Sequence, residues 1–456
     1  MSVEKGDVVK VNVVDIGSKG EGICKYNDFT IFVDGVVPGD ILETEITIKK
    51  KNYANGKVVK MLKESDIRET PKCEYFDSCG GCQIQNIKYE EQLKYKTNKV
   101  KSAIERIGKI TDVEVYDTIG MEEPYHYRNK GQFPIKMKNN KAQIGFYKVG
   151  THDLVDLNEC IIQDEISNKV LNIVREIINE NRISAYNEKS KKGVLRHVVI
   201  KTAYHTKDTM VIIVTNGRDL PHIGKFVNRL KEVPEVKSLI QNVNKQRGNK
   251  ILGLKNYTLY GDDFILDNIG GIDFEISPLS FFQVNPRQTE TLYNKALEFA
   301  DLKGDETVFD LYCGIGSISL FLAKNAKKVY GVEVVAQSIR DAKRNAKRNG
   351  IFNAEFVVGK AEEMIPKLYK NDIIADVVVL DPPRKGCEPR LLDTIIDMNP
   401  KKIVYVSCKP STLARDLKYF VEHNYEIQEI QPVDMFPHST HVETVVGLVN
   451  NTNVSK

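Results

Sequence analysis

The sequence lacks long apolar runs, internal repeats and low-complexity tracts. No stretch approaches the roughly 18 apolar residues that a membrane-spanning helix needs. The N-terminal residues MSVEKGDVVK also have no apolar core of the kind found in a secretory signal. We therefore expect a cytoplasmic protein with no membrane partner.

An excess of charge of one sign is also nearly absent. Lys and Arg together number 66 and Asp and Glu 62, so the formal net charge is +4. So small an excess does not identify a polyanionic partner. Cysteine is scarce, with eight residues in the chain, but several of the eight are clustered. Because the cytosol keeps thiols reduced, we expect these clustered cysteines to bind metal or perform chemistry rather than form disulfides.

Three segments of the 456-residue chain differ in their pattern, and the chain is too long for a single core. Residues 1–62 hold about five short strands separated by Gly and Pro turns, which predicts a small OB-like barrel. Residues 63–275 mix strands and helices behind a cysteine cluster, which predicts an α+β domain. Residues 276–456 alternate short apolar strands with helices, the pattern of a doubly wound, Rossmann-like α/β domain.

Cationic and aromatic side chains gather at three places, where they suit phosphate binding and base stacking. An ordinary solvated surface explains each of them about as well. They are Lys49, Lys50, Lys51 and Lys57 around Tyr53, the segment 125–130 (YHYRNK), and a helical stripe of Arg340, Lys343, Arg344, Lys347 and Arg348.

A glycine-containing loop, DLYCGIG at 310–316, lies between a buried strand and a helix. Gly314 and Gly316 let the backbone approach a ligand closely, although a turn used only for packing is the alternative. Glu333 ends the next strand, 19 positions after Gly314, where an acidic residue accepts hydrogen bonds from ribose hydroxyls. The loop lacks the full G-x-G-x-x-G spacing, which favours a cofactor with an adenosine and no pyrophosphate. Asp381 follows a further apolar strand and is expected at the same sheet edge.

Two residues near the C-terminus have the chemistry of a nucleophile and a base. Cys408 follows the strand KIVYVS, where Lys409 and Arg415 could favour its thiolate. Glu443 begins the last apolar strand, and a partly dry setting there would raise its pKa toward useful base strength. Taken singly, a small core cysteine and a solvated acid explain these residues as well.

A second set of cysteines has the spacing of metal ligands. Cys73, Cys79 and Cys82 form C-x5-C-x2-C, and Cys160 lies far downstream. Zinc and an iron–sulfur cluster both fit, and the spacing alone does not choose between them. Unligated thiols are the remaining interpretation. Cys24, Cys313 and Cys387 have no comparable partners, and we expect no role for them.

Several motifs, taken in order, resemble those of the RNA 5-methyluridine methyltransferases, bacterial enzymes that methylate uracil in ribosomal or transfer RNA. The motifs are FFQVNP at 281–286, FDLYCGIGSISL at 309–320, GVE at 331–333, DPPRKG at 381–386, SCKPSTLARD at 407–416 and HVETV at 441–445. The resemblance covers essentially the whole chain, since residues 1–62 look like the TRAM domain that these enzymes often carry. It implies a class I S-adenosylmethionine-dependent methyltransferase domain behind a TRAM barrel and a central RNA-binding domain.

The resemblance also implies roles for individual residues. Gln283, Tyr312, Glu333 and Asp381 would bind S-adenosylmethionine or line its pocket, Cys408 would be the nucleophile and Glu443 the base. Cys73, Cys79, Cys82 and Cys160 would hold a [4Fe–4S] cluster, in preference to zinc.

The expected substrate is a uridine of RNA, methylated at carbon 5 through a covalent bond from Cys408 to carbon 6 of the ring. The TRAM-like start and the cysteines resemble the enzymes of 23S ribosomal RNA more than those of transfer RNA, which is the alternative. A non-catalytic RNA-binding assembly factor and an amino-group methyltransferase of adenine or guanine are the rivals from other classes. No obligate protein partner is evident.

Overall fold

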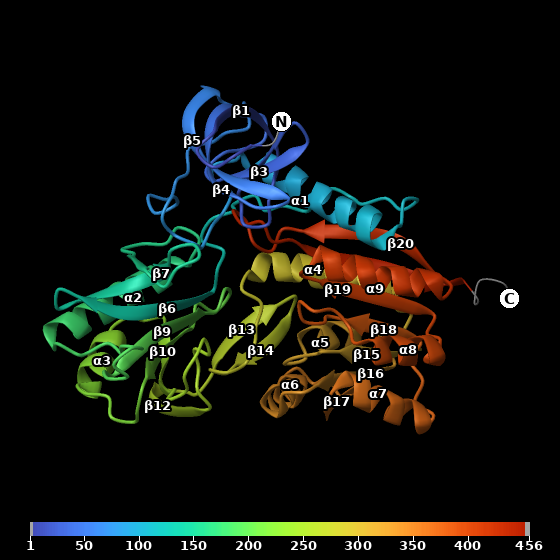
Figure 1. Cartoon of the computed structure of the whole chain (residues 1–456). Helices are drawn as coiled ribbons and strands as arrows, with labels where there is room; N and C mark the ends of the chain where they lie inside the picture. The colour runs from blue at the N-terminus through green and yellow to red at the C-terminus, as the bar shows by residue number, and fades with distance from the viewer. Residues whose placement is uncertain (1–2, 452–456) are drawn as a thin grey trace.

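The computed structural model describes residues 3–451 and has three lobes, a barrel and two larger sheets with helices (Figure 1). The outermost residues of the first and last expected domains, 1–2 and 452–456, lie outside the described residues. Within the described part, no helix combines the length and the apolar character needed to cross a membrane.

The N-terminal lobe is a closed five-stranded barrel in the order β1-β2-β3-β5-β4. Alternate residues of β1, among them Val9, Val11 and Val13, point into the barrel and are buried. This confirms the OB-like barrel expected from the strand and turn pattern. The strands are β1 (Val8–Ile16), β2 (Gly22–Tyr26), β3 (Phe29–Val33), β4 (Ile41–Lys49) and β5 (Tyr53–Lys63).

The helix that follows the cysteine cluster belongs to the C-terminal lobe rather than to the central one. This helix, α1 (Tyr89–Ala103), continues into a π-helical turn, η1 (Ile104–Gly108). It lies beside β20 and α9 (Figure 1), and its Val100 is fully buried in one core with Leu413 of α9. The segment 63–275, expected as one domain, therefore contributes α1 to the C-terminal lobe.

The central lobe is a seven-stranded sheet in the order β12-β11-β10-β9-β6-β7-β8. Helices α2 and α3 cover one face, where Val174 and Phe226 pack with Phe133 of the sheet. The hairpin β13–β14 packs instead into the core of the C-terminal lobe. The elements are β6 (Lys130–Lys138), β7 (Lys141–Tyr147), β8 (Leu154–Asp156), α2 (Glu165–Glu180), β9 (Leu195–Thr202), β10 (Thr209–Thr215), α3 (Ile223–Leu230), β11 (Val236–Val243), β12 (Lys255–Gly261), β13 (Ile265–Ile269) and β14 (Ile272–Ile276).

The C-terminal lobe is a doubly wound sheet in the order β17-β16-β15-β18-β19-β21-β20, as the alternating pattern predicts. Its first five strands are parallel, and β21 is antiparallel to both β19 and β20. The elements are α4 (Pro286–Ala300), β15 (Thr307–Leu311), α5 (Ser317–Ala323), β16 (Lys328–Glu333), α6 (Ala336–Arg348), β17 (Ala354–Val358), α7 (Ala361–Lys370), β18 (Val377–Leu380), α8 (Pro389–Met398), β19 (Lys402–Ser407), α9 (Pro410–Glu422), β20 (Tyr425–Val433) and β21 (Glu443–Asn450).

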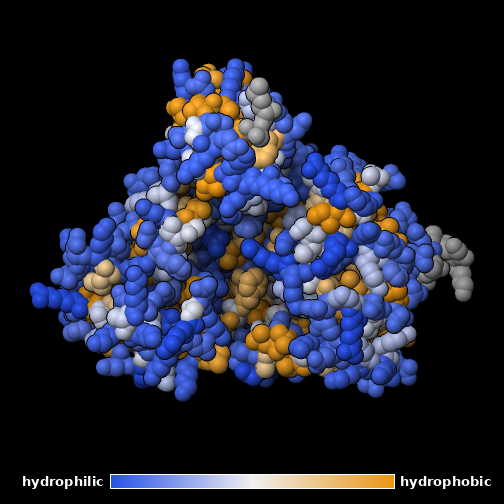
Figure 2. Space-filling model, viewed as in Figure 1, coloured by the Kyte–Doolittle hydropathy of each residue, from blue (hydrophilic) through white to orange (hydrophobic). Residues whose placement is uncertain are grey.

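The strand order reverses between β15 and β18, and open α/β sheets bind ligands at the carboxyl ends of strands next to such a reversal. Glu333, Asp381 and Cys408 all lie at or just beyond carboxyl ends of parallel strands, so the fold brings them to one edge. Figure 2 shows a hollow at the centre of the molecule, between the barrel and the two larger lobes.

Candidate active site and cysteine pocket

The loop after β15 holds Gly314 and Gly316, both with positive φ. Gly316 has a φ of +80°, and a Cβ there would lie 3.0 Å from the ring of Phe356, so a larger residue is excluded. Glu333 accepts hydrogen bonds from the backbone N–H of Gly314 (3.3 Å) and of Val335 (2.8 Å). The Glu333 carboxylate is thereby fixed beside the glycine loop, at the position expected from the spacing.

Three carboxyl groups gather at this edge of the sheet. Burial raises the pKa of Asp381 to about 7. Asp310 is fully buried and accepts a hydrogen bond from Ser319 at one carboxylate oxygen, while its other oxygen has no partner. Burial, together with the charges of Asp381 and Glu333, raises the pKa of Asp310 to about 7 as well. Negative potential in a crevice of this kind favours a cationic ligand.

Of the two other residues expected at the cofactor, Tyr312 lies at this edge of the sheet and Gln283 lies shortly before α4. Tyr312 directly follows β15 with a φ of +69°, and its hydroxyl donates to Glu362 (3.0 Å), so its ring is the part free to contact a ligand. Gln283 is partly buried in the segment between β14 and α4. Its neighbour Phe281 is 62% exposed, and sequence reasoning assigned it no role.

Cys408 and Glu443 face each other across an antiparallel strand pair. Ser407 of β19 pairs with Thr444 of β21, so the next residues along each strand, Cys408 and Glu443, are also opposite. Burial, together with the charges of Glu443 and Asp381, raises the pKa of the Cys408 thiol to about 11. Burial and the Asp381 charge likewise hold the pKa of Glu443 well above its usual range. The structure thus brings the expected nucleophile, the expected base and Asp381 together.

Arg384 is the residue whose positive charge acts on Cys408 and Glu443, and the sequence analysis predicted no role for it. Its charge lowers the pKa of both Cys408 and Glu443, against the effect of burial. Arg415, which the sequence also suggested for this role, pairs with Asp416 (2.7 Å). Lys409 caps α9, and its backbone N–H donates to Ser407. The DPPR motif places this arginine three residues after Asp381, and this short spacing is the sequence feature from which its place in the site could have been predicted.

Replacing Arg384 with glutamine should lower the reactivity of the Cys408 thiol. Loss of the positive charge raises the thiol pKa, so less thiolate is present at neutral pH and the alkylation profile moves to higher pH. We expect alkylation of Cys408 by iodoacetamide, followed by mass spectrometry, to slow roughly three- to tenfold at neutral pH. Arg390→Gln, a change at an exposed arginine of α8, is the matched control. An unchanged pH profile in Arg384→Gln would contradict this role.

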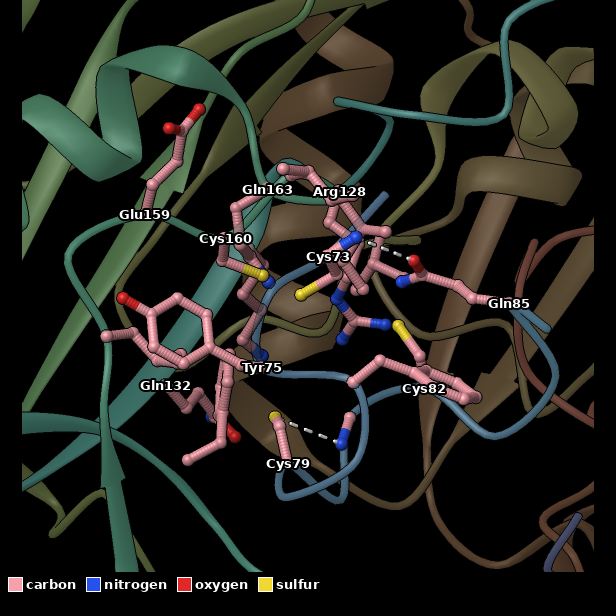
Figure 3. Close-up of a pocket in the computed structure, with 18 residues that line it drawn as sticks. Cys73, Tyr75, Cys79, Cys82, Gln85, Arg128, Gln132, Glu159, Cys160 and Gln163 are labelled. Atoms are coloured by element: carbon pink, nitrogen blue, oxygen red, sulfur yellow. Dashed lines mark hydrogen bonds between the residues drawn. The ribbon is translucent and has the colours of Figure 1, made fainter. Parts of the chain in front are cut away.

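The four clustered cysteines line one pocket of about 300 Å³, which also contains Arg128. Figure 3 shows Cys73, Cys79, Cys82 and Cys160 arranged around it. None is in a disulfide, and the charges of Cys73, Cys79 and Cys160 each act on the Cys82 thiol. The chain thus brings the distant Cys160 to the three cysteines of the C-x5-C-x2-C segment.

The four thiols of this pocket are not gathered around one point. Among the described residues, no three His, Cys, Asp or Glu side chains are gathered closely enough to hold one metal ion. The thiols instead surround a cavity, and four thiols are the donor set of an iron–sulfur cluster. Cys24, Cys313 and Cys387 are buried elsewhere as free thiols.

Most of the residues that the sequence suggested for RNA binding make contacts within the protein instead. Tyr127 is buried, and Tyr125 lies against the ring of His438 at 4.5 Å between centroids. In the α6 stripe, Arg344 and Arg348 both pair with Glu275, at 3.2 and 2.6 Å. Tyr53 of the barrel, by contrast, is 40% exposed.

Comparison with known proteins identifies relatives along nearly the whole chain. The family model described as tRNA (Uracil-5-)-methyltransferase matches residues 88–451, and the TRAM domain model matches residues 2–59. An uncharacterized RNA methyltransferase of Clostridium tetani is 51% identical over 97% of this chain and 96% of its own length. One of Halalkalibacterium halodurans is 48% identical over 98% of each chain.

A solved structure agrees with these matches. It is the tRNA (uracil-54, C5)-methyltransferase of Pyrococcus abyssi in complex with S-adenosyl-L-homocysteine, with a TM-score of 0.78 and 29% identity over 97% of this chain and 100% of that one. The chain therefore belongs to the tRNA (uracil-5-)-methyltransferase family of S-adenosylmethionine-dependent RNA methyltransferases, and it carries a TRAM domain at its N-terminus.

Proposed function

We propose that this enzyme methylates carbon 5 of a uridine in 23S ribosomal RNA through a covalent bond between Cys408 and carbon 6. The observation that carries this proposal is the pairing of Ser407 with Thr444, which sets Cys408 opposite Glu443 beside Asp381. A thiol opposite a buried carboxyl group whose charge acts on it, at this edge of the sheet, suits nucleophilic catalysis followed by proton removal.

Cys408 and Glu443 each carry out a different step of the proposed reaction. The Cys408 thiolate adds to carbon 6, and the electron pair of the ring double bond moves to form an enolate that is nucleophilic at carbon 5. S-adenosylmethionine, when bound, supplies the methyl group that carbon 5 accepts. Carbon 5 then carries one proton too many, which Glu443 removes. The double bond re-forms as the carbon–sulfur bond breaks and Cys408 leaves as thiolate.

The target uridine must leave its stack to reach Cys408, which lies at a strand end and is only partly exposed. The central hollow between the lobes offers space for RNA beside this edge (Figure 2). Arg384, which is exposed next to the site, adds positive charge for the phosphates.

We assign the cofactor contacts to Gln283, Tyr312, Glu333 and Asp381. Glu333 is the most testable of them, because its fixed carboxylate is placed to accept hydrogen bonds from the ribose. Glu333→Ala should weaken S-adenosylhomocysteine binding about 10- to 100-fold in calorimetry, the cost of losing charged hydrogen bonds. Glu355→Ala, on the neighbouring strand β17, removes a surface carboxylate that pairs with Lys328 and should leave binding unchanged. Equal affinities of the two variants would overturn the assignment.

The choice of 23S ribosomal RNA rests on the TRAM domain combined with the cysteine pocket. Transfer RNA is the alternative, and the Pyrococcus abyssi enzyme, named for uracil 54 of transfer RNA, favours it. RNA from a strain that lacks the gene decides between them when its 5-methyluridines are mapped by mass spectrometry. Loss of a methyl group from 23S RNA alone supports the proposal, and loss from transfer RNA alone contradicts it.

We further propose that Cys73, Cys79, Cys82 and Cys160 hold a [4Fe–4S] cluster with a structural role, since the proposed methylation moves no electrons. The support is a set of four free thiols around one cavity, with the guanidinium of Arg128 available to offset the negative charge of a thiolate-bound cluster. Zinc is less favoured, because no three of the metal-binding side chains in the described part of the chain lie close enough together to hold one ion.

Protein purified without oxygen should contain iron and acid-labile sulfide in about equal amounts and absorb visible light. Cys82→Ser should lose most of both, because one of four ligands is gone. Cys24→Ser changes a buried thiol of the barrel and should retain the full content. Zinc without sulfide in the anaerobic protein would overturn the cluster assignment.

A further inference from the structure

The connection between β20 and β21, residues 434–442, leads directly into Glu443 and is held along its length by other parts of the chain. Six of its backbone carbonyl oxygens accept hydrogen bonds from residues that lie before α1, in α1, at the start of α4 and in the segment before β6. The donors are Gln288 to Asp434 (3.2 Å), Asn285 to Met435 (3.2 Å), Lys96 to Phe436 (3.0 Å), Tyr127 to Pro437 (3.1 Å), Gln83 and Ile84 to His438 (2.9 and 3.1 Å) and Lys99 to Thr440 (2.5 Å).

Lys96 of α1 holds this connection by charge as well. Its ammonium lies 2.5 Å from Asp434, and both side chains are fully buried. The other carboxylate oxygen of Asp434 accepts from the hydroxyl of Tyr89 (2.9 Å). A buried ion pair adds little net stability because both charges lose water, but it strongly restricts geometry, since either charge alone would be left uncompensated.

The cysteine segment, residues 73–84 with Cys73, Cys79 and Cys82, also contacts this connection. Gln83 and Ile84 directly follow Cys82, and their two backbone N–H groups both donate to the carbonyl of His438. His438 is 3% exposed and contacts the ring of Tyr125. On the opposite side, the hydroxyl of Thr440 donates to Ser18 of the barrel (2.8 Å).

We propose that residues 434–442 are a clasp that positions Glu443, and that Lys96 is its principal positioning residue. The cysteine segment is one wall of this clasp, so the order of the cysteine pocket and the placement of Glu443 are coupled. The inference rests on the proposed role of Glu443 as the base.

Loosening the clasp should affect one chemical step more than the others. Cys408 lies just beyond the end of β19, and it takes part in none of the hydrogen bonds to residues 434–442 given above. Proton removal from carbon 5 needs Glu443 in place. A loosened clasp therefore slows breakdown of the covalent intermediate more than its formation, so the adduct accumulates relative to product.

The test compares adduct and turnover in variants of the clasp. Lys96→Met removes the charge, and Tyr127→Phe removes only the hydroxyl that donates to Pro437. Tyr369→Phe is the matched control, because that hydroxyl also donates to a backbone carbonyl, of Asp397, but far from the clasp. Turnover of Lys96→Met should fall about tenfold or more, as expected on losing a charged hydrogen bond. The ratio of denaturant-resistant RNA–protein adduct to product should rise, with a smaller rise for Tyr127→Phe.

Hydrogen exchange of peptides spanning 434–443 supplies a readout that does not depend on activity. Exchange should be faster in Lys96→Met and in Cys82→Ser than in Tyr369→Phe and Cys24→Ser. Unchanged exchange, or adduct and product falling in the same proportion, would overturn the clasp and leave Lys96 with a role in stability alone. If Cys408→Ala retains full activity, the proposed covalent function fails, and the exchange data still decide whether the clasp exists.

Discussion

Cys408→Ala should reduce methylation at least about 10³-fold, the scale seen when an enzyme loses its nucleophile. Without the sulfur, carbon 5 of uracil never becomes nucleophilic enough to accept a methyl group, even with both substrates bound. Turnover is measured with methyl-labelled S-adenosylmethionine and RNA from a strain that lacks the gene. The expected pattern is unchanged S-adenosylhomocysteine affinity together with no product and no adduct.

This substitution also separates the enzyme from its rivals. An amino-group methyltransferase needs no cysteine, so full activity of Cys408→Ala would contradict the covalent mechanism. A non-catalytic assembly factor would show no turnover in the unmodified protein either. Cys387→Ala is the matched control, because it removes a buried thiol of the same lobe that we assign no chemistry. It should retain most of the activity.

The sequence was sufficient to predict the fold of the C-terminal lobe and the fact that three of its candidate site residues lie at one edge of the sheet. Parallel strands end at one edge, so Glu333, Asp381 and Cys408 are brought together by any doubly wound sheet with this strand order. Glu443 is different, because its position depends on β21 being antiparallel to β19. Nothing in the local pattern of HVETVV specifies that direction, and the resemblance to a family supplied the assignment.

The sequence did not reveal the partners of several residues, and the physical cause is the same for each. Contacts between distant segments are not encoded in local periodicity. The YHYRNK segment has the composition of an RNA-binding surface, yet Tyr127 is buried and bonds to Pro437, more than 300 positions away. Arg415 lies seven positions after Cys408 in the sequence, but it pairs with the carboxylate of Asp416. Arg384 acts on Cys408 from another loop, which only the folded arrangement reveals.

Glu443→Gln should convert the enzyme into one that stays attached to its RNA. The amide has nearly the same shape as the carboxyl group but cannot accept the carbon 5 proton, so addition of Cys408 and methylation proceed while release of the cysteine is blocked. We expect turnover to fall about 10²- to 10⁴-fold, the usual contribution of a general base. A methylated RNA–protein adduct that resists denaturant should accumulate to nearly one per enzyme, and digestion followed by mass spectrometry should locate it on Cys408.

The double variant Cys408→Ala with Glu443→Gln is the control for this adduct, because it keeps the altered base and removes the only sulfur proposed to bond the ring. It should form no adduct. Retained turnover in Glu443→Gln without any adduct would exclude Glu443 as the base. Asp381 would then be the carboxyl group to test, since it lies in the same cluster, its charge raises the pKa of both Cys408 and Glu443, and burial raises its own pKa to about 7. A base of that pKa is half ionised near neutral pH and could take the same proton if the ring were turned toward it.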